Sequence, residues 1–215
     1  MTRIPKRSAL GLTAALIATP ALATCPSGAD LATGITLSRS APAYETYYER
    51  SDGRLTEVRR ATRGDQTLEV TQRFQHHLAP WVTEQPGGSL EFRYDGEVSE
   101  LNNLKASRQW TSSLTVLQNG EPLTTGQRTV SMIDEGQMAV GGCLYRIWEV
   151  GTTTRLLTGA VVGYRQYYSP TLGLVLRSIQ LDARPAVMVS YRTSLTASPR
   201  ASSWIDRSTR PSVGE

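Results

Sequence analysis

The chain has 215 residues and carries 23 Lys and Arg against 19 Asp and Glu, a formal net charge of +4. Three of the basic residues lie within the first 23 positions, so the rest of the chain carries 20 basic against 19 acidic residues. A charge this close to zero argues against a nucleic-acid or anionic-membrane partner attracted by net charge. The length beyond position 23 fits one domain with a sizeable core and does not comfortably fit two.

The first 23 residues have the layout of a secretory signal. Arg3, Lys6 and Arg7 form a basic head, and an apolar stretch over 9–23 ends in the small-x-small sequence Ala-Leu-Ala. This stretch is shorter than the roughly 20 residues that a membrane-spanning helix needs. The sequence therefore predicts a signal peptide over 1–23, export, and no transmembrane span in the mature chain.

The two cysteines, Cys25 and Cys143, raise the sharpest question in the sequence. Lipid anchoring at Cys25 requires cleavage directly before it, and Thr24 does not fit the small residue that lipoprotein signals favour there, although Leu22 does fit. An even cysteine count in an exported chain favours a disulfide. We therefore predict a Cys25–Cys143 disulfide, with a lipid anchor at Cys25 as the alternative.

Residues 24–196 predict a single antiparallel β domain. Hydrophobic residues alternate with charged or polar ones, as in Leu68, Val70 and Phe74 against their neighbours, which is typical of a half-buried strand. Turn dipeptides at 52–53, 95–96 and 119–120, with glycine breaks at 86–88, 135–136 and 141–142, separate such segments. We expect about ten strands, at 44–50, 54–62, 67–79, 90–94, 114–116, 127–134, 143–150, 155–168, 174–181 and 187–195. A sandwich, a barrel or a large curved sheet would fit this all-β pattern.

Two segments do not follow the alternation. Residues 98–108 predict an irregular stretch with weak helix, and residues 197–215 predict a disordered tail that is rich in Ser, Arg and Pro. The strand at 143–150 has apolar residues on both faces and is expected to be central. The segment Ser169-Pro170 to Gly173 predicts a tight hairpin, because Pro fixes one turn dihedral and Gly allows a positive φ.

The histidines and acids give no catalytic pattern. Alternation places His76 on the apolar face and His77 on the wet face, so the two cannot chelate one metal as a pair. Five acids are expected on wet faces in ion pairs with arginines of neighbouring strands: Glu45, Glu49, Glu57, Glu69 and Glu91. No serine lies in a Gly-x-Ser-x-Gly frame. We therefore assign no catalytic residue, no metal site and no cofactor.

The sequence YYSPTLGLVLRS, residues 167–178, resembles a segment found in a known group of proteins. Together with the strands before it, over about 127–195, it resembles the C-terminal half of bacterial exported β-domains of unknown function, which are similar to the half-barrel of periplasmic lipoprotein carriers. The resemblance implies an all-β, mainly antiparallel fold with a single large curved sheet or half-barrel and little helix. It also implies that the concave side of the sheet can enclose a hydrophobic ligand or lipid chain.

The expected concave face is apolar. We place ten residues on it: Leu68, Val70, Phe74, Phe92, Leu114, Val116, Tyr145, Ile147, Val161 and Val189. They either line a ligand cavity or pack on one another and on a covering segment near 98–108. The residues expected to bind a ligand are Phe74, His76, Phe92, Tyr145, Ile147 and Tyr168.

The function expected from these features is a non-catalytic binding or interaction module of the bacterial envelope, in the periplasm. Its partner would be a hydrophobic small molecule or an envelope component. The alternatives are a hydrolase-like enzyme centred on His76 and a structural protein anchored through a lipid on Cys25.

Overall fold

The computed structural model describes residues 25–40, 43–63, 66–181 and 194–197. These residues form one twelve-stranded sheet whose strand order is β11-β10-β9-β8-β7-β6-β5-β4-β3-β2-β1-β12. Each strand from β2 to β11 pairs in antiparallel fashion with the strand before it in the sequence. The predicted all-β fold with a single large curved sheet is confirmed.

The elements have the following bounds. The strands are β1 (Ile35–Ser40), β2 (Ala43–Ser51), β3 (Arg54–Arg63), β4 (Gln66–His76), β5 (Ala79–Gln85), β6 (Gly88–Tyr94), β7 (Gln109–Gln118), β8 (Glu121–Val140), β9 (Cys143–Leu156), β10 (Val161–Ser169), β11 (Leu174–Gln180) and β12 (Ser194–Ala197). Two 3-10 helices, η1 (Gly28–Ala32) and η2 (Val98–Asn103), and one short α-helix, α1 (Leu104–Ser107), complete the described chain.

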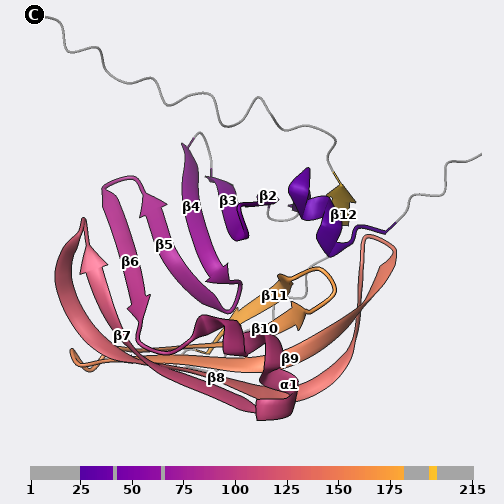
Figure 1. The fold of residues 1–215 in the computed structure, drawn as a ribbon. Helices are drawn as coiled ribbons and strands as arrows, with labels where there is room; N and C mark the ends of the chain where they lie inside the picture. Colours follow the sequence, from indigo (N-terminus) through magenta and orange to yellow (C-terminus); the bar gives the residue numbers. More distant parts are fainter. Residues whose placement is uncertain (1–24, 41–42, 64–65, 182–193, 198–215) are drawn as a thin grey trace, which may run out of the picture.

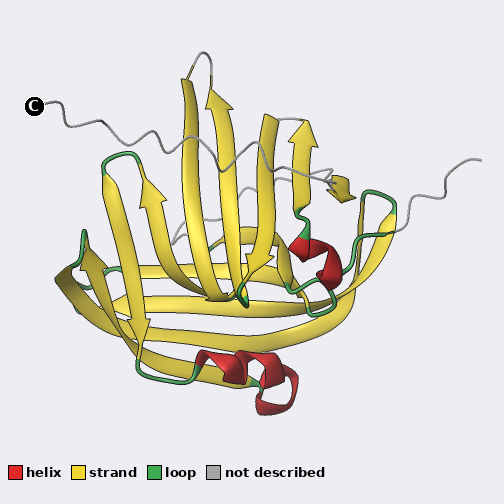
Figure 2. Ribbon diagram, turned by 45° about the horizontal axis from the view of Figure 1, so that its top comes forward, coloured by secondary structure: helices red, strands yellow, loops and turns green. Residues whose placement is uncertain are grey.

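The sheet curls into a half-barrel. In Figure 1 the long strands β8 and β9 run beneath the molecule and rise at one end, while β3 to β6 stand across them. Figure 2 shows the same arrangement with the few helical turns confined to two places at the edge of the sheet. Register shifts at Met132/Asp134 in β8 and at Tyr167/Tyr168 in β10 help the long strands to bend, because an extra residue kinks a strand and increases its twist.

The turn dipeptides were predicted with mixed success. Residues 52–53 and 119–120 join β2 to β3 and β7 to β8, and all four residues have positive φ, as a type I′ hairpin requires. The hairpin predicted at 95–96 and the strand break predicted at 135–136 are wrong. The first leads into η2, and Gly136 lies within β8 opposite Ile147. A strand can contain glycine where backbone hydrogen bonds to a neighbouring strand keep it extended.

The strand predictions missed three features. Strands β1 and β5 were not expected, and the single strand expected at 155–168 is two strands joined by a turn at 157–160. Leu156 N donates to Ala160 O at 2.9 Å and Gly159 has a φ of 87° in that turn. The turn is formed from apolar and small residues, so hydropathy alone could not distinguish it from a strand. Most of the strand predicted at 187–195 lies outside the described residues, as do the leader and positions 198–215.

The interior of the half-barrel contains two clusters of buried side chains. The first joins η1 and β1 to β4 with the ends of β8, β9 and β11, through Leu31, Ile35, Leu37, Tyr48, Leu55, Phe74, Val140, Cys143, Tyr145, Ile147, Leu172, Leu174 and Leu176. The second lies beneath η2 and α1, through Leu78, Ala79, Val98, Leu101, Leu104, Trp110, Val130, Met132, Trp148, Val150, Tyr168 and Val175. The segment expected to be irregular with weak helix thus packs over part of the concave face.

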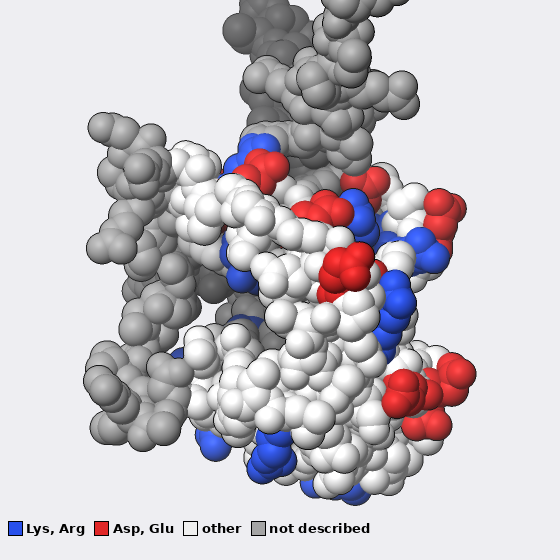
Figure 3. Space-filling view, turned by 90° about the vertical axis from the view of Figure 1, so that its left-hand side faces the viewer, with Lys and Arg blue, Asp and Glu red and all other residues white. Residues whose placement is uncertain are grey.

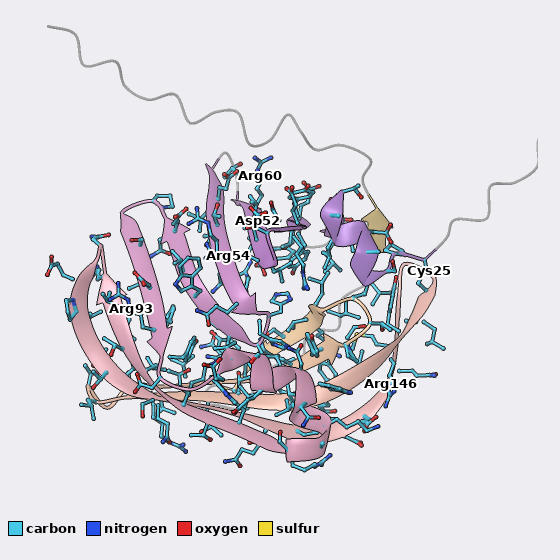
Figure 4. The ribbon with its side chains drawn as sticks, in the orientation of Figure 1. Cys25, Asp52, Arg54, Arg60, Arg93 and Arg146 are labelled. Atoms are coloured by element: carbon cyan, nitrogen blue, oxygen red, sulfur yellow. A yellow bond between two sulfur atoms is a disulfide. The ribbon has the colours of Figure 1, made fainter. Side chains whose placement is uncertain are left out.

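A disulfide joins the start of the described chain to β9. Cys25 Sγ is bonded to Cys143 Sγ, with the two Cα atoms 5.6 Å apart, as predicted. Figure 4 shows Cys25 beside the end of the β8–β9 hairpin. The Tyr145 hydroxyl donates to Pro26 O at 3.1 Å, and Gly28 N donates to Thr171 O at 3.1 Å. The disulfide fits a non-reducing environment.

Candidate functional site on the concave face

Five of the six residues predicted to bind a ligand lie within the packed interior. Phe74, Tyr145 and Ile147 belong to the first cluster and Tyr168 to the second. His76 is buried and its ring lies 5.1 Å from that of Tyr168. These side chains fill the half-barrel with one another and with their neighbours. Phe92, the sixth, is only half-buried.

His76 lacks the partners of an acid-base residue. Its Nδ1 accepts a hydrogen bond from Leu78 N at 3.2 Å, and its Nε2 has no partner within the described ranges. Burial lowers the pKa of His76 to about 3, and electrostatic interactions with His77 and Arg50 act in the same direction. The Nε2 of this neutral imidazole contacts no carboxylate or hydroxyl among the described residues, so His76 lacks the partners that a hydrolytic site centred on it would use.

His77 was expected in solvent, and that expectation is wrong. Its side chain is buried, with the ring 4.6 Å from that of Phe74 and 5.3 Å from that of Tyr48. The strict alternation of a strand does not reach this residue, because β4 ends at His76 and its register with β5 shifts between Phe74 and His76. The bend turns both histidines inward.

His77, in the turn between β4 and β5, connects to strands β11 and β3 through two hydrogen bonds. Its Nδ1 accepts a hydrogen bond from Val175 N of β11 at 2.9 Å, so the proton of the neutral ring resides on Nε2. Nε2 lies 3.3 Å from Glu57 Oε2 of β3 and donates to it. The other carboxylate oxygen of Glu57 accepts a hydrogen bond from Arg59 Nη2. Both ring nitrogens of His77 are therefore occupied.

Glu57 was expected on a wet face and is instead 2% exposed. Burial alone would raise the pKa of this carboxyl, but the hydrogen bond from His77 and the charge of Arg59 outweigh burial, so the pKa is lowered. Burial likewise raises the pKa of Tyr48 well above its ordinary value, and the Glu57 charge adds to that effect. A buried charge with these partners holds β11 against β3 and β4, which is a structural cross-link.

Other arginine–carboxylate pairs link neighbouring strands on the outer surface, and of the five acids predicted to form such pairs Glu69 does. Arg60 Nε lies 2.6 Å from Glu69 Oε2, and Arg73 Nη1 lies 2.9 Å from Glu84 Oε1. Glu91 pairs with Arg93 on its own strand instead. Figure 3 shows acidic and basic groups on the same face, with uncharged residues covering most of it. These pairs are partly exposed, so each contributes little to stability.

Arg128 of β8 forms a second polar link across the interior. Its Nε and Nη2 donate to Leu78 O at 3.1 and 2.8 Å, and its Nη1 donates to Thr154 Oγ1 at 2.9 Å. Burial lowers the pKa of this guanidinium. Arg128 was not predicted from the sequence as an interior residue. The alternation of β8 does indicate its position, because Arg128 shares a face with the core residues Val130 and Met132.

The concave face continues beyond the two clusters. On β4, Leu68, Val70 and Gln72 share a face with Phe74, and on β6, Leu90 and Phe92 share a face with Tyr94, which packs against the second cluster. The register pairs Phe92 with Val116 and Leu90 with Thr83, which in turn pairs with Gln72. We call Leu68, Val70, Leu90 and Phe92 the open wall.

The open wall is apolar but not packed into the core. Leu68 is 51% exposed, and Val70, Leu90 and Phe92 are half-buried. Its polar contribution is one cross-strand pair, in which Gln72 Nε2 donates to Thr83 Oγ1 at 3.0 Å. Two other residues expected on the concave face do not join it: Val161 is exposed beside the turn at 157–160, and Val189 lies outside the described residues.

Within the described part of the chain, no group of three or more His, Cys, Asp or Glu side chains is placed to hold a metal ion. None of its helices is long and apolar enough to cross a membrane. Comparisons with protein-family models, with curated proteins and with solved structures found no match. The fold and the site define a disulfide-linked antiparallel half-barrel with a partly filled concave face.

Proposed function

We propose that the protein is a non-catalytic binding module of the bacterial envelope that holds a hydrophobic ligand against the open wall. The observation that supports this is the run of concave apolar side chains that the two core clusters leave half-buried or exposed. A ligand site of this class needs an apolar lining and a few polar groups that fix orientation. The Gln72–Thr83 pair supplies such groups beside Leu90.

The proposal revises the set of ligand-binding residues. Phe92 stays in it, whereas Phe74, His76, Tyr145, Ile147 and Tyr168 support the site from within the core. Burying a half-exposed apolar side chain beneath a ligand removes more apolar area from water than contacting one that is already packed. Leu68 and Phe92 are therefore the residues whose exchange should affect binding most.

The proposed compartment is the periplasm. The leader layout and the disulfide support export into an oxidising compartment, and the resemblance to lipoprotein-carrier half-barrels is in keeping with a ligand that carries an acyl chain. The intact mass of the protein under non-reducing conditions tests this directly. It reports the cleavage site, any acylation, and the loss of two hydrogens on disulfide formation.

The binding test uses a neutral fluorescent apolar probe, N-phenyl-1-naphthylamine, with the full mature protein. We expect saturable binding, several-fold weaker binding by Leu68→Gln, and no change in Leu144→Gln. Leu144 is the matched control, because it is a leucine of similar exposure, 64%, on β9 outside both clusters. Absence of saturable probe binding, or equal binding by the two variants, would contradict the proposal.

Native mass spectrometry of protein isolated from the periplasm complements the probe assay. A ligand that co-purifies with the wild-type protein and is depleted in Leu68→Gln is the expected result. A single apo mass for the wild-type protein would count against an apolar ligand that is bound in the cell.

A further inference from the structure

Arg128 is a buried guanidinium without an acidic partner. Its side chain reaches Leu78 O and Thr154 Oγ1, which are neutral acceptors, and no ion pair within the described ranges includes it. The half-exposed Arg59, by contrast, pairs with the buried carboxylate of Glu57. Burying a charge is costly unless it is paired, so Arg128 differs from the usual pattern of protein interiors.

The hydrogen bonds of Arg128 leave donors unused. A guanidinium has five N–H groups, and the contacts to Leu78 and Thr154 occupy three of them. The neighbouring Thr152 shares the face of Thr154 on β9 and is 1% exposed, and its Oγ1 has no hydrogen-bond partner among the described residues. Two separate residues on this part of the concave face thus retain donors, and an anionic oxygen is the group that both would serve.

Arg128 lies next to residues that are not fully packed. Thr154 pairs in register with Val162 of β10, and Thr152 pairs with Tyr164. Thr154 and Tyr164 are half-buried, and Val162 is 37% exposed. Tyr94 of β6 pairs in register with Leu114 of β7, and Leu114 pairs with Gly126 of β8, two residues from Arg128 on the same face. The guanidinium is therefore close to the less densely packed part of the interior.

This polar region adjoins the open wall. Tyr94 and Phe92 are alternate residues on the concave face of β6, and Phe92 belongs to the open wall. An elongated ligand lying along Leu90 and Phe92 would reach the Tyr94 end of the strand with one terminus. That terminus would come to the side of the second cluster on which Arg128 of β8 lies, because Tyr94 packs against this cluster and Arg128 bonds Leu78 O.

We propose that the ligand is an amphiphile with an anionic head group, which Arg128 and Thr152 bind while its apolar chain lies on the open wall. This inference rests on the proposed function. The anion supplies the missing counter-charge of Arg128 through charge-assisted hydrogen bonds to its remaining N–H groups. A carboxylate and a phosphate both have this chemistry.

The test displaces the neutral probe from the mature protein with three ten-carbon ligands: decanoate, decyl phosphate and decanol. Because a hydrogen bond to a charged group is stronger than a neutral one, we expect at least one anionic ligand to bind about 10- to 100-fold more tightly than decanol. Whichever of decanoate and decyl phosphate binds better identifies the head group. In Arg128→Met that preference disappears while decanol binds as before, and Arg128→Lys retains part of it.

The outcomes separate this inference from the function on which it rests. If no ligand, decanol included, displaces the probe, the apolar site itself is refuted. If wild-type protein binds decanol as tightly as both anions, the apolar site stands and the role of Arg128 is refuted.

A second measurement covers an Arg128→Met variant that fails to fold. Decanoate labelled with carbon-13 at its carboxyl group is titrated by nuclear magnetic resonance on the wild-type protein. The bound carboxylate should stay ionised to lower pH than the unbound ligand. Titration at the same or a higher pH would overturn the inference.

Discussion

His76 makes the free energy of unfolding of this protein depend on pH between the pKa of this histidine in the folded protein and its pKa in the unfolded chain. Its pKa is about 3 in the folded protein, because burial and electrostatic interactions with His77 and Arg50 oppose protonation, against about 6.5 in the unfolded chain. The unfolded state therefore binds more protons between these two values. The stability that a neutral His76 permits is fully present above pH 6.5 and is lost as the pH falls toward 3.

The size of the effect follows from the two pKa values. Between pH 7.5 and pH 5 the difference in proton binding lowers the free energy of unfolding by about 2 kcal/mol, and by pH 4 the loss reaches about 3 kcal/mol. The lowered pKa of Glu57 contributes in the same direction, but only below its unfolded value near 4.5. The interval from pH 7.5 to pH 5 therefore excludes Glu57 and isolates the histidines.

The assay is urea unfolding of the wild-type protein and of His76→Gln at pH 7.5 and pH 5. A glutamine side-chain oxygen can accept the hydrogen bond from Leu78 N but does not bind a proton in this range. We expect the wild-type protein to lose about 2 kcal/mol more than the variant between the two pH values. Because His77 is present in both proteins, only its interaction with His76 differs between them. Equal pH dependence in the two proteins would refute the reasoning.

Three further predictions concern stability at neutral pH and are measured by urea unfolding. Replacing both Cys25 and Cys143 by Ala removes a cross-link between residues 118 positions apart and should lower the free energy of unfolding by about 5 kcal/mol, according to the chain-entropy relation. A decrease of less than about 1 kcal/mol would contradict this prediction. Leu174→Ala removes a fully buried side chain and should lower the free energy of unfolding by about 2 to 5 kcal/mol. Leu144→Ala, on the surface, should change it by no more than about 0.5 kcal/mol. Similar losses in the two variants would show that the first cluster is not packed as described. Tyr145→Phe removes the hydrogen bond to Pro26 and should cost about 1 kcal/mol, and an unchanged midpoint would mean that the bond is not formed in solution.

The candidate site shows which local signals were sufficient and which were misleading. Phe92 and Val70 were placed on the concave face from alternation alone, and that placement holds because β4 and β6 are regular there. The same alternation failed at His77, which follows the end of β4. Glu57 was misplaced because a carboxylate in a strand is ordinarily solvated, and only the hydrogen bonds with His77 and Arg59 make its burial tolerable.

The sequence by itself determined most of the strand pattern, the hairpins at 52–53 and 119–120, and the disulfide. These features depend on residues adjacent in the chain, or on two cysteines that have only one another as partners. Only the tertiary structure decided which concave side chains pack and which stay open, and that Arg128 and His77 reach across the interior. Those contacts join residues 50 and 98 positions apart, and they exist because the sheet curls until its first and last strands face one another. Local periodicity contains no information about that closure.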